Sequence, residues 1–460
     1  MDLSEKFKII LWFVLLSGCI KSAAQSEYLD RSEMLSDLAY LQQELERHHP
    51  NLYTYSSPAA VREWFRSQHE LPEDRIDLQK AYHIVTSFSA VLKDGHSYIY
   101  PDAGHLDRFY QTAPLFPLDV FLMGQKLIVT GNFSNEQNIP EGSELVSING
   151  VSIPDLLSFV LEHMSRDGDN LEYPKYLFYQ FFPAYYSFFY GFPEAFEIVY
   201  VDQQGESTIA NIKGITRDEI RKKRADTQSN KEMGIDLQTD EHNQLAVLTI
   251  RSFDNDLLKK EYHIRFKREI RTAFKKINVE NIQHLAIDLR GNQGGELSNG
   301  VYLLKHFMDQ AFTCVDSYFV IRKQPDHKRQ PKQLRTKWDV SFQPKKINHF
   351  NGKVYILLNG GSFSCSAIVS NAFKNQQRGI IIGQMSGGSA YINSGGPDKV
   401  ITLPHSGISF TIPKTQYNLR ADPSVIGLGV MPDISVQDIP FHCLEVPDPY
   451  LVQLMQLISK

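Results

Sequence analysis

The sequence predicts an α/β protein, because short apolar strands alternate with amphipathic helices over its second half. These strands are rich in β-branched and other apolar residues, and helical periodicity follows three of the four. Strands that alternate with helices favour a parallel-rich sheet covered on both faces. The four strands expected are 245–250, 283–289, 354–358 and 379–382.

Length and composition indicate a globular protein of two or three domains. The chain has 460 residues, 42% hydrophobic and 22% charged, which are values of folded rather than disordered proteins. Its net charge of −5 gives no support to a nucleic-acid partner. The sequence contains no internal repeat and no low-complexity tract.

The N-terminus is predicted to direct export. Two lysines precede the apolar run 9–16, which suits a signal-peptide core but is too short to span a bilayer. The tetrapeptide 16–19 (LSGC) resembles the bacterial lipobox, so 1–18 is expected to be a lipoprotein signal peptide with lipidation at Cys19. The alternatives are cleavage near 23–25 or an anchor that is never removed. If Cys19 is lipidated, we expect a protein of the bacterial cell envelope, at the periplasmic or outer-membrane face, that contacts the membrane only through its lipid anchor.

Residues 19–112 are predicted to form a helical region. Apolar residues recur at three- and four-residue spacing in 35–48 and in 78–92. His48 and His49 raise the question of a metal site. Because adjacent residues on a helix point in different directions, a polar cluster at the helix end is favoured.

Residues 113–202 are predicted to form a β-rich domain with an aromatic helical segment. The stretch 139–151 resembles the core of a PDZ domain, in which a strand leads into an Asn-Gly turn. The Tyr- and Phe-rich segment 173–196 is interpreted as core at a domain interface, with an apolar-ligand surface as the alternative. The polar residues 203–243 are expected to be an irregular connection with a short helix near 217–224.

The remaining chain is predicted to hold the α/β core. This core is expected over 244–445, with a terminal helix at 446–460. Its insert 322–346 is rich in Lys and Arg and broken by prolines, which favours a solvated loop.

Three turns directly follow predicted strands, at 288–295, 359–364 and 383–389. Because the carboxyl ends of parallel strands meet at one edge of a sheet, we expect these turns to lie together. Ser364 would then stand at the start of a helix, beside backbone N–H groups able to stabilise an oxyanion. The alternative is that Ser362 or Ser364 only caps the helix.

The order of motifs carries a resemblance to a known family. The segments DGHS, the PDZ-like stretch, DLRGNQGG, NGGSFSCSA, GQMSGGS and GVMPDISV occur in this order between His48 and Val436. The chain resembles the tail-specific (C-terminal-processing) and tricorn-type serine peptidases. The resemblance implies a crotonase/Clp-protease-like βα spiral core, with an N-terminal helical region and an inserted PDZ-like β-rich domain. It implies no metal and no organic cofactor.

The resemblance also assigns roles to residues. Ser364 matches the family's nucleophile, and the N–H of Cys365 with that of Gly294 or Gly295 would form the oxyanion hole. His96, in the DGHS motif, matches the histidine base of the tricorn-like branch. Neutral histidine is a suitable base for a serine hydroxyl near pH 7.

The chain departs from the family's patterns at several places, of which two bear on the catalytic groups. Ser389 stands where the processing-peptidase branch has a lysine, so a Ser-Lys dyad is not expected. The acidic residue that orients His96 is not fixed by the motifs, and Asp94 and Asp422 are the candidates. A triad without its third member keeps only part of its activity.

Taken together, the sequence predicts an exported serine-type endopeptidase acting on peptides or proteins. The alternative is a catalytically weak or inactive protein on the same scaffold that binds peptides or apolar ligands. An esterase is less consistent, because no G-x-S-x-G motif surrounds Ser364.

Overall fold

The computed structural model describes residues 27–136, 139–227, 233–323, 329–334, 338, 340–396 and 398–459. The expected signal peptide (1–18) and the expected lipidation site Cys19 lie outside this part of the chain. In the described ranges, none of the helices has the length and apolar character needed to cross a bilayer.

The N-terminal region is helical, as predicted. The helix expected at 35–48 is α2 (Arg31–His48), and the one expected at 78–92 divides into α4 (Leu78–Ser87) and α5 (Ser89–Leu92). Helix α4 begins after Asp77, whose side chain accepts a hydrogen bond from the N–H of Lys80. The other elements are β1 (Tyr28–Asp30), α3 (Pro58–Ser67), η1 (Gln68–Glu70), β2 (Arg75–Asp77), β3 (Ile99–Tyr100) and α6 (Ala103–Gln111).

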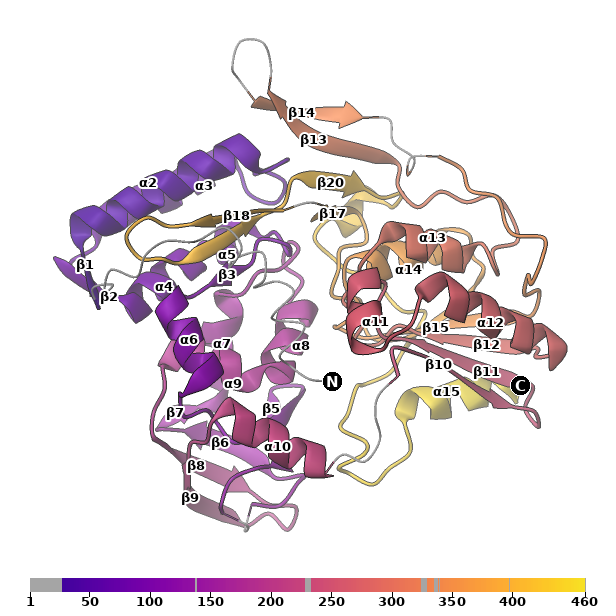
Figure 1. Cartoon of the computed structure of the whole chain (residues 1–460), viewed down its shortest axis with the longest axis horizontal. Coiled ribbons are helices and arrows are strands. Elements are labelled where there is room, and N and C mark those ends of the chain that lie inside the picture. The colour runs from indigo at the N-terminus through magenta and orange to yellow at the C-terminus, as the bar shows by residue number, and fades with distance from the viewer. Residues whose placement is uncertain are drawn as a thin grey trace.

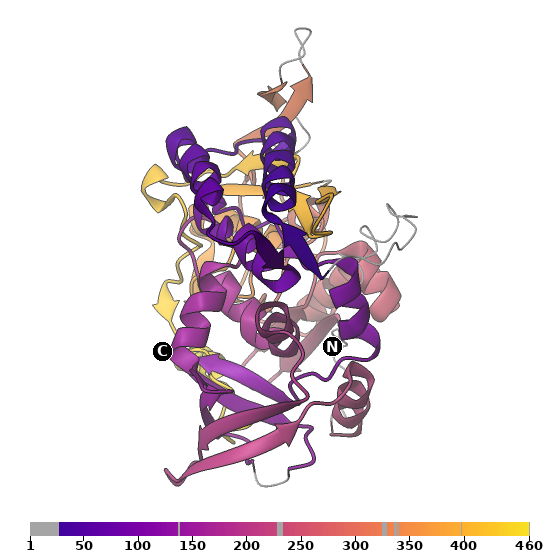
Figure 2. The same cartoon turned by 90° about the vertical axis from the view of Figure 1, so that its left-hand side faces the viewer.

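An antiparallel sheet follows, with strand order β4-β5-β6-β8-β9 and β7 paired to β6. Helix α7 (Ile153–Glu162) packs against β5, β6 and β7 of this sheet, and its apolar side chains are buried. The strands are β4 (Leu118–Met123), β5 (Lys126–Asn132), β6 (Glu144–Ile148), β7 (Val151–Ser152), β8 (Ala195–Val201) and β9 (Ser207–Lys213). Figure 2 shows this sheet below the N-terminal helices.

The aromatic segment forms α8 (Glu172–Gln180) and α9 (Phe182–Tyr190). Most of its rings are buried in the core shared by the N-terminal helices and the antiparallel sheet. The interpretation of this segment as core is therefore confirmed.

The expectation of an irregular connection over 203–243 is wrong in two places. Residues 207–213 form β9, and residues 235–240 form β10 (Ile235–Asp240), whereas the expected helix is present as α10 (Arg217–Thr227). Strand β9 exposes most of its side chains, so its sequence lacks the apolar alternation that indicates a strand. Strand β9 is held instead by seven paired positions along β8.

The second half contains a six-stranded sheet of order β10-β11-β12-β15-β16-β21. Only the pair β10–β11 is antiparallel, so the predicted parallel-rich sheet is confirmed. Its remaining strands are β11 (Leu245–Ile250), β12 (His284–Asp288), β15 (Lys353–Leu358), β16 (Gly379–Gly383) and β21 (Ile434–Ser435).

Helices cover both faces of this sheet (Figure 1). One face packs on α12, α13 and α14, and the opposite face packs on α15. Strand β15 is buried at every position but its first, as expected for a central strand between two helical layers. The helices are α11 (Asn255–Glu261), α12 (Phe266–Val279), α13 (Leu297–Leu304), α14 (Cys365–Asn375) and α15 (Pro449–Ile458).

The prediction that the insert 322–346 is a solvated loop is wrong in part. Part of it forms the β13–β14 hairpin at the top of Figure 1, in a four-stranded sheet of order β14-β13-β20-β17. A three-stranded sheet of order β18-β19-β3 then joins the C-terminal half to the N-terminal region. The elements are β13 (Ser317–Lys323), β14 (Arg329–Leu334), β17 (Ile392–Gly395), β18 (Lys399–Thr402), β19 (Ser409–Ile412), β20 (Thr415–Asn418) and η2 (Pro423–Val425).

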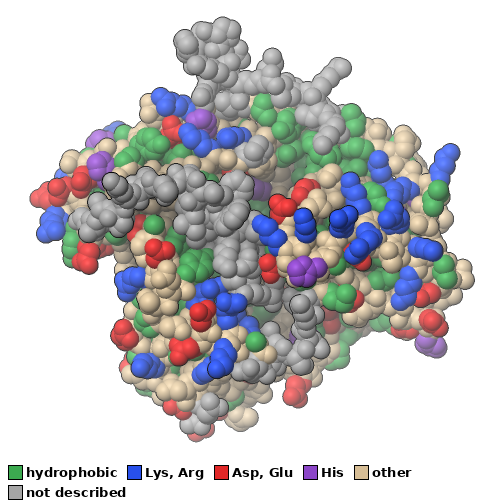
Figure 3. Space-filling view, in the orientation of Figure 1, with side chains coloured by type: hydrophobic (Ala, Val, Ile, Leu, Met, Phe, Trp, Pro, Cys, Tyr) green, Lys and Arg blue, Asp and Glu red, His purple; other side chains and the backbone are tan. Residues whose placement is uncertain are grey.

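The surface carries both signs of charge. In the face shown in Figure 3, Lys and Arg side chains gather on the right, and Asp and Glu are interspersed elsewhere. On this face the mixture of both signs agrees with the small net charge of −5.

Candidate active site

Ser364 lies at the junction between the turn after β15 and helix α14. Its backbone has φ 53° and ψ −117°, a conformation that L-residues rarely adopt. Such strain costs roughly 1–3 kcal/mol and is found where function demands a particular side-chain direction. The side chain of Ser364 therefore leaves the main chain at an angle that an unstrained turn does not offer.

Neither serine of this turn caps α14, so the capping alternative is wrong. Ser364 occupies the N-cap position without a side-chain capping bond. Ser362 is fully buried, and its hydroxyl donates to the carbonyl of Leu289 at 2.8 Å. Ser362 thus ties the turn after β15 to the turn after β12.

The three predicted turns meet at the carboxyl edge of the sheet, as expected. The N–H of Phe363 donates to the carbonyl of Asn292 at 3.0 Å, which joins the first turn to the second. The N–H of Gly388 donates to the carbonyl of Ser362 at 3.2 Å, which joins the second turn to the third. Ser364 is held between these two contacts.

The glycines of the first turn allow it to approach Ser364. A Cβ atom on Gly294 would lie 2.8 Å from Cβ of Ser364, too close for any larger residue. The N–H of Gly294 donates to Oδ1 of Asn292 at 2.9 Å and is therefore engaged. In the described part of the chain, no hydrogen bond uses the N–H groups of Gly295 and Cys365.

His96 reaches Ser364 from the N-terminal region. Its Nε2 lies 3.1 Å from Oγ of Ser364, within hydrogen-bonding distance. The pairing of β3 with β19 places the loop that carries His96 against the C-terminal half of the chain. The imidazole also packs on the ring of Phe363, with 4.6 Å between ring centroids, and the ring of Phe363 stacks on that of Tyr173.

Burial lowers the pKa of His96 to about 4, although the charge of Asp94 opposes this shift. Removing a group from water disfavours its charged form, and for histidine this lowers the pKa. The imidazole is accordingly neutral at pH 7 and able to accept a proton.

Asp94 holds the main chain of His96 and not its ring. Its Oδ1 accepts hydrogen bonds from the N–H of His96 at 2.9 Å and from the hydroxyl of Ser97 at 3.1 Å. Its Oδ2 accepts a bond from Ser394 of β17 and lies 3.5 Å from Nε2 of His49. Burial opposes ionisation of Asp94, but its contacts with His49 and Ser394 hold its pKa below the usual range.

No carboxylate bonds to the ring of His96 among the described residues. Its Nδ1 is buried without a hydrogen-bond partner there. Asp422, the second candidate for the orienting acid, is exposed and accepts a bond from the N–H of Ser424. The structure therefore brings Asp94 to His96 and does not bring Asp422 to it.

The comparison of sequences identifies the region that contains Ser364. Residues 244–436 match the profile of Peptidase family S41. The chain contains a Peptidase family S41 domain. This domain includes Ser364 and the glycine turn, whereas His96 and Asp94 lie outside the matched residues.

Curated relatives support this assignment. A probable CtpA-like serine protease of Staphylococcus epidermidis is 27% identical over 207 residues, which are 44% of this chain and 36% of that protein. A probable CtpA-like serine protease of Staphylococcus saprophyticus is 23% identical over 206 residues, which are 45% of this chain and 36% of that protein. The match thus spans 36% of the length of these relatives.

Solved structures share the fold over nearly the whole chain. Mature CPAF superimposes with a TM-score of 0.66 and 13% identity, covering 93% of this chain and 96% of that chain. CPAF complexed with lactacystin gives the same TM-score and identity, covering 93% of this chain and 98% of that chain. The likeness therefore extends beyond the S41 domain to the N-terminal half.

Ser389, at the position of the lysine in the processing-peptidase branch, has a structural role next to the S41 site. It is fully buried, and its hydroxyl accepts hydrogen bonds from the N–H groups of Tyr391 and Ile392, both at 3.2 Å. Its own N–H donates to Asp167 at 3.0 Å. Sequence reasoning missed Asp167, which lies in a polar stretch between two helices and matches no motif.

His48 and His49 form the polar helix-end cluster that was predicted. Nε2 of His48 lies 3.4 Å from Glu44 one turn earlier and 2.8 Å from Nζ of Lys399, while His49 faces Asp94. The two rings therefore point to different partners. In the residues that the structure describes, no group of three or more His, Cys, Asp or Glu could hold a metal ion.

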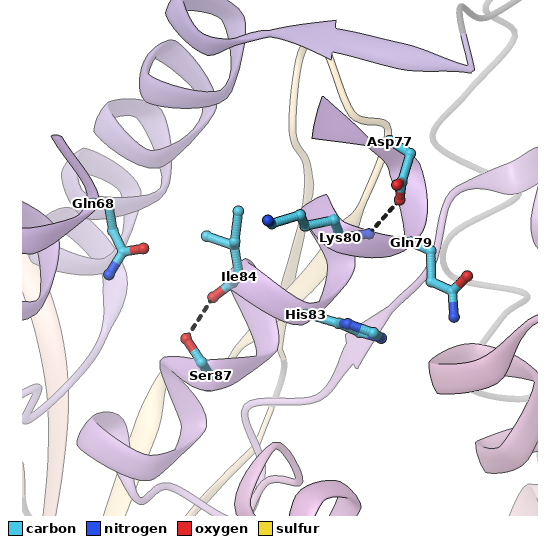
Figure 4. A pocket seen from close by; sticks show the side chains of 7 residues that line it. All are labelled: Gln68, Asp77, Gln79, Lys80, His83, Ile84 and Ser87. Carbon is cyan, nitrogen blue, oxygen red and sulfur yellow. Dashed lines mark hydrogen bonds between the residues drawn. The ribbon is translucent and has the colours of Figure 1, made fainter. Parts of the chain in front are cut away.

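An open hollow on the surface of α4 is separate from the S41 site (Figure 4). Its side chains come from η1, the end of β2 and α4, and include neither Ser364 nor His96. Two of its hydrogen bonds are helix contacts, from the N–H of Lys80 to Asp77 and from Ser87 to the carbonyl of Ile84. The residues that line it are Gln68, Asp77, Gln79, Lys80, His83, Ile84 and Ser87.

Proposed function

We propose that this protein is a serine peptidase that hydrolyses peptide bonds, with Ser364 as nucleophile and His96 as general base. The observation that carries the proposal is the 3.1 Å contact between Oγ of Ser364 and Nε2 of His96. The S41 domain and the CtpA-like relatives support the same reaction class.

In the proposed reaction, neutral His96 carries its proton on Nδ1 and accepts the Ser364 hydroxyl proton at Nε2. Oγ then forms a bond to the peptide carbonyl carbon, and the carbonyl oxygen becomes an oxyanion. Collapse of this tetrahedral intermediate breaks the C–N bond, and His96 returns the proton to the leaving amine. Water, deprotonated by the same histidine, hydrolyses the acyl-enzyme and restores Ser364.

The proposed oxyanion hole uses the N–H groups of Cys365 and Gly295. Both are free of other hydrogen bonds in the described residues, and that of Cys365 starts helix α14, where the helix dipole favours negative charge. Gly294, the other candidate, acts in this proposal by close approach to Ser364, because its N–H is bound to Asn292.

The unpartnered Nδ1 of His96 favours modest activity. Imidazolium formed during the reaction has no carboxylate to stabilise it on the distal side of the ring. A weak or inactive protein that binds peptides or apolar ligands is the alternative that this observation supports.

Hydrolysis of an unfolded, fluorescently labelled polypeptide such as casein tests the proposal. We expect cleavage by the wild-type protein and its loss in Ser364→Ala and in His96→Ala. Ser459→Ala is the control, because Ser459 is exposed at the end of α15 and its hydroxyl bonds only to the carbonyl of Met455. Cleavage that survives in Ser364→Ala contradicts the proposal.

We also propose that the protein is exported and anchored by lipid at Cys19, and that the β4–β9 sheet is a PDZ-like domain. The basic and apolar N-terminus supports export, and the Asn149-Gly150 turn after β6 supports the PDZ-like reading. Metabolic incorporation of an alkyne fatty acid into the wild-type protein and not into Cys19→Ser tests the anchor.

A further inference from the structure

Asp167 is a buried carboxylate beside the S41 site that the proposed reaction does not use. It lies between α7 and α8, outside the residues that match Peptidase family S41, and its residue surface is 1% exposed. Burying a carboxylate costs free energy unless hydrogen bonds compensate it. Its contacts therefore show what it is placed to hold.

The first oxygen of this carboxylate holds the loop that carries His96. Oδ1 of Asp167 accepts a hydrogen bond from the N–H of Gly95 at 2.9 Å. A Cβ atom on Gly95 would lie 2.7 Å from this oxygen, so only glycine permits the approach. Gly95 directly precedes His96 in the chain.

The second oxygen holds the turn that packs on Ser364. Oδ2 of Asp167 accepts a hydrogen bond from the N–H of Ser389 at 3.0 Å. The preceding residue, Gly388, donates to the carbonyl of Ser362, and a Cβ on it would lie 2.8 Å from the backbone nitrogen of Ser364. One carboxylate thus connects the supports of both catalytic side chains.

Neighbours of Asp167 in the chain repeat this arrangement. The N–H of Gly168 donates to the carbonyl of Lys93 at 2.9 Å, at the start of the His96 loop. Nδ2 of Asn170 donates to the carbonyls of Ser386 and Gly387 at 2.9 and 3.1 Å, in the turn before Ser389. These contacts make the segment a bridge between two parts of the chain that are distant in sequence.

We propose that ionised Asp167 is a positioning residue that sets the separation between His96 and Ser364. The inference rests on the proposed function of these two residues. A carboxylate accepts both N–H bonds, whereas a carboxylic acid presents a hydroxyl donor to one of the two N–H groups. Protonation of Asp167 therefore releases either the His96 loop or the Ser389 turn.

The surroundings of Asp167 make this change accessible near neutral pH. Burial and the nearby charge of Asp94 raise the pKa of Asp167 to about 7, despite the bonds from Ser389 and Gly95. The other titratable groups that face it are Asp94, which stays ionised with a lowered pKa, and Tyr55 and Tyr173, whose pKa values burial raises. Two further charged groups are close by but have other partners: His49 contacts Asp94, and Lys93 forms an ion pair with Asp169.

The test is the rate of labelling of Ser364 by a fluorescent fluorophosphonate as a function of pH. We expect the wild-type rate to rise with pH through about 7, the pKa of Asp167, and not near 4, the pKa of His96. Asp167→Asn removes the titrating group, so its rate should be about 10- to 100-fold lower on the plateau. Its midpoint should move down towards that of His96.

Asp169→Asn is the matched control, because it removes the same charge from an exposed side chain two residues away. It should keep the wild-type rate and midpoint. The inference is overturned if Asp167→Asn is labelled at the wild-type rate with the wild-type pH midpoint. If Asp167→Asn does not fold, the wild-type pH profile decides, and a labelling midpoint near 4 overturns the inference. Wild-type protein that is not labelled at any pH contradicts the proposed function instead, and the inference falls with it.

Discussion

The strained backbone of Ser364 predicts an unusual order of stability between two inactive variants. With φ 53° and ψ −117°, Ser364 adopts a conformation that glycine tolerates and alanine does not. Ser364→Ala keeps the Cβ atom and hence the strain, whereas Ser364→Gly removes both. We therefore expect the glycine variant to be the more stable of the two.

The magnitude follows from two opposing terms. Relief of strain stabilises the glycine variant by roughly 1–3 kcal/mol. Greater freedom of glycine in the unfolded chain destabilises it by roughly 0.4–1 kcal/mol. The net expectation is an increase of about 1 kcal/mol in the free energy of unfolding of Ser364→Gly over Ser364→Ala.

Urea unfolding followed by circular dichroism measures this difference. The dependence of the free energy of unfolding on urea concentration should be the same in both variants, which shows that they expose similar surface on unfolding. The control is Ala372→Gly in the middle of α14, where glycine loses helix propensity and a buried methyl group and should lower the free energy of unfolding by at least about 1 kcal/mol. The reasoning would be refuted if Ser364→Gly had a lower free energy of unfolding than Ser364→Ala, which is the order expected for glycine and alanine at position 372.

Three further substitutions have defined outcomes. Gly294→Ala places a Cβ atom 2.8 Å from that of Ser364, so fluorophosphonate labelling should fall at least about 10-fold. Asp94→Asn weakens the hydrogen bonds that hold the His96 loop, which should lower the free energy of unfolding by about 2 kcal/mol and slow labelling in the same assay. Arg290→Met leaves the buried carboxylates of Asp288 and Asp448 uncompensated and should cost about 3–5 kcal/mol in urea unfolding, whereas Arg66→Met, in an exposed ion pair, should leave the free energy of unfolding close to the wild-type value. Unchanged labelling of Gly294→Ala or Asp94→Asn would contradict the site described above. Equal losses of unfolding free energy in Arg290→Met and Arg66→Met would contradict the buried ion-pair network of Arg290.

The S41 half of the fold was predictable because its signals are local. Buried strands such as β15 are continuous apolar runs, and a turn with glycine or serine follows each strand that contributes to the site. Parallel pairing then brings the turns to one edge, where the bonds from Phe363 to Asn292 and from Gly388 to Ser362 join them.

The approach of His96 depends instead on contacts that no local pattern encodes. Its loop is fixed by the pairing of β3 with β19 and by the bond between Asp94 and Ser394, across 300 residues of chain. The motif indicated that His96 belongs to the site, but the geometry of its support follows only from the tertiary fold. Asp167 was missed for the same reason, because its partners are 72 and 222 residues away.

Strands β9 and β14 show where composition misleads. Both lie in polar or basic stretches, which favour loops when the sequence is considered alone. Each pairs along its length with a neighbouring strand, β8 for β9 and β13 for β14, so backbone pairing decides their structure.

Identification of the residue that carries a fluorophosphonate adduct tests the central claim most directly. Labelled wild-type protein is digested, and the modified peptide is sequenced by mass spectrometry. The account predicts one adduct on Ser364, abolished in His96→Ala because the hydroxyl then lacks its base 3.1 Å away. An adduct on another serine, or equal labelling of His96→Ala, contradicts the assignment of Ser364 and His96 as the reacting pair.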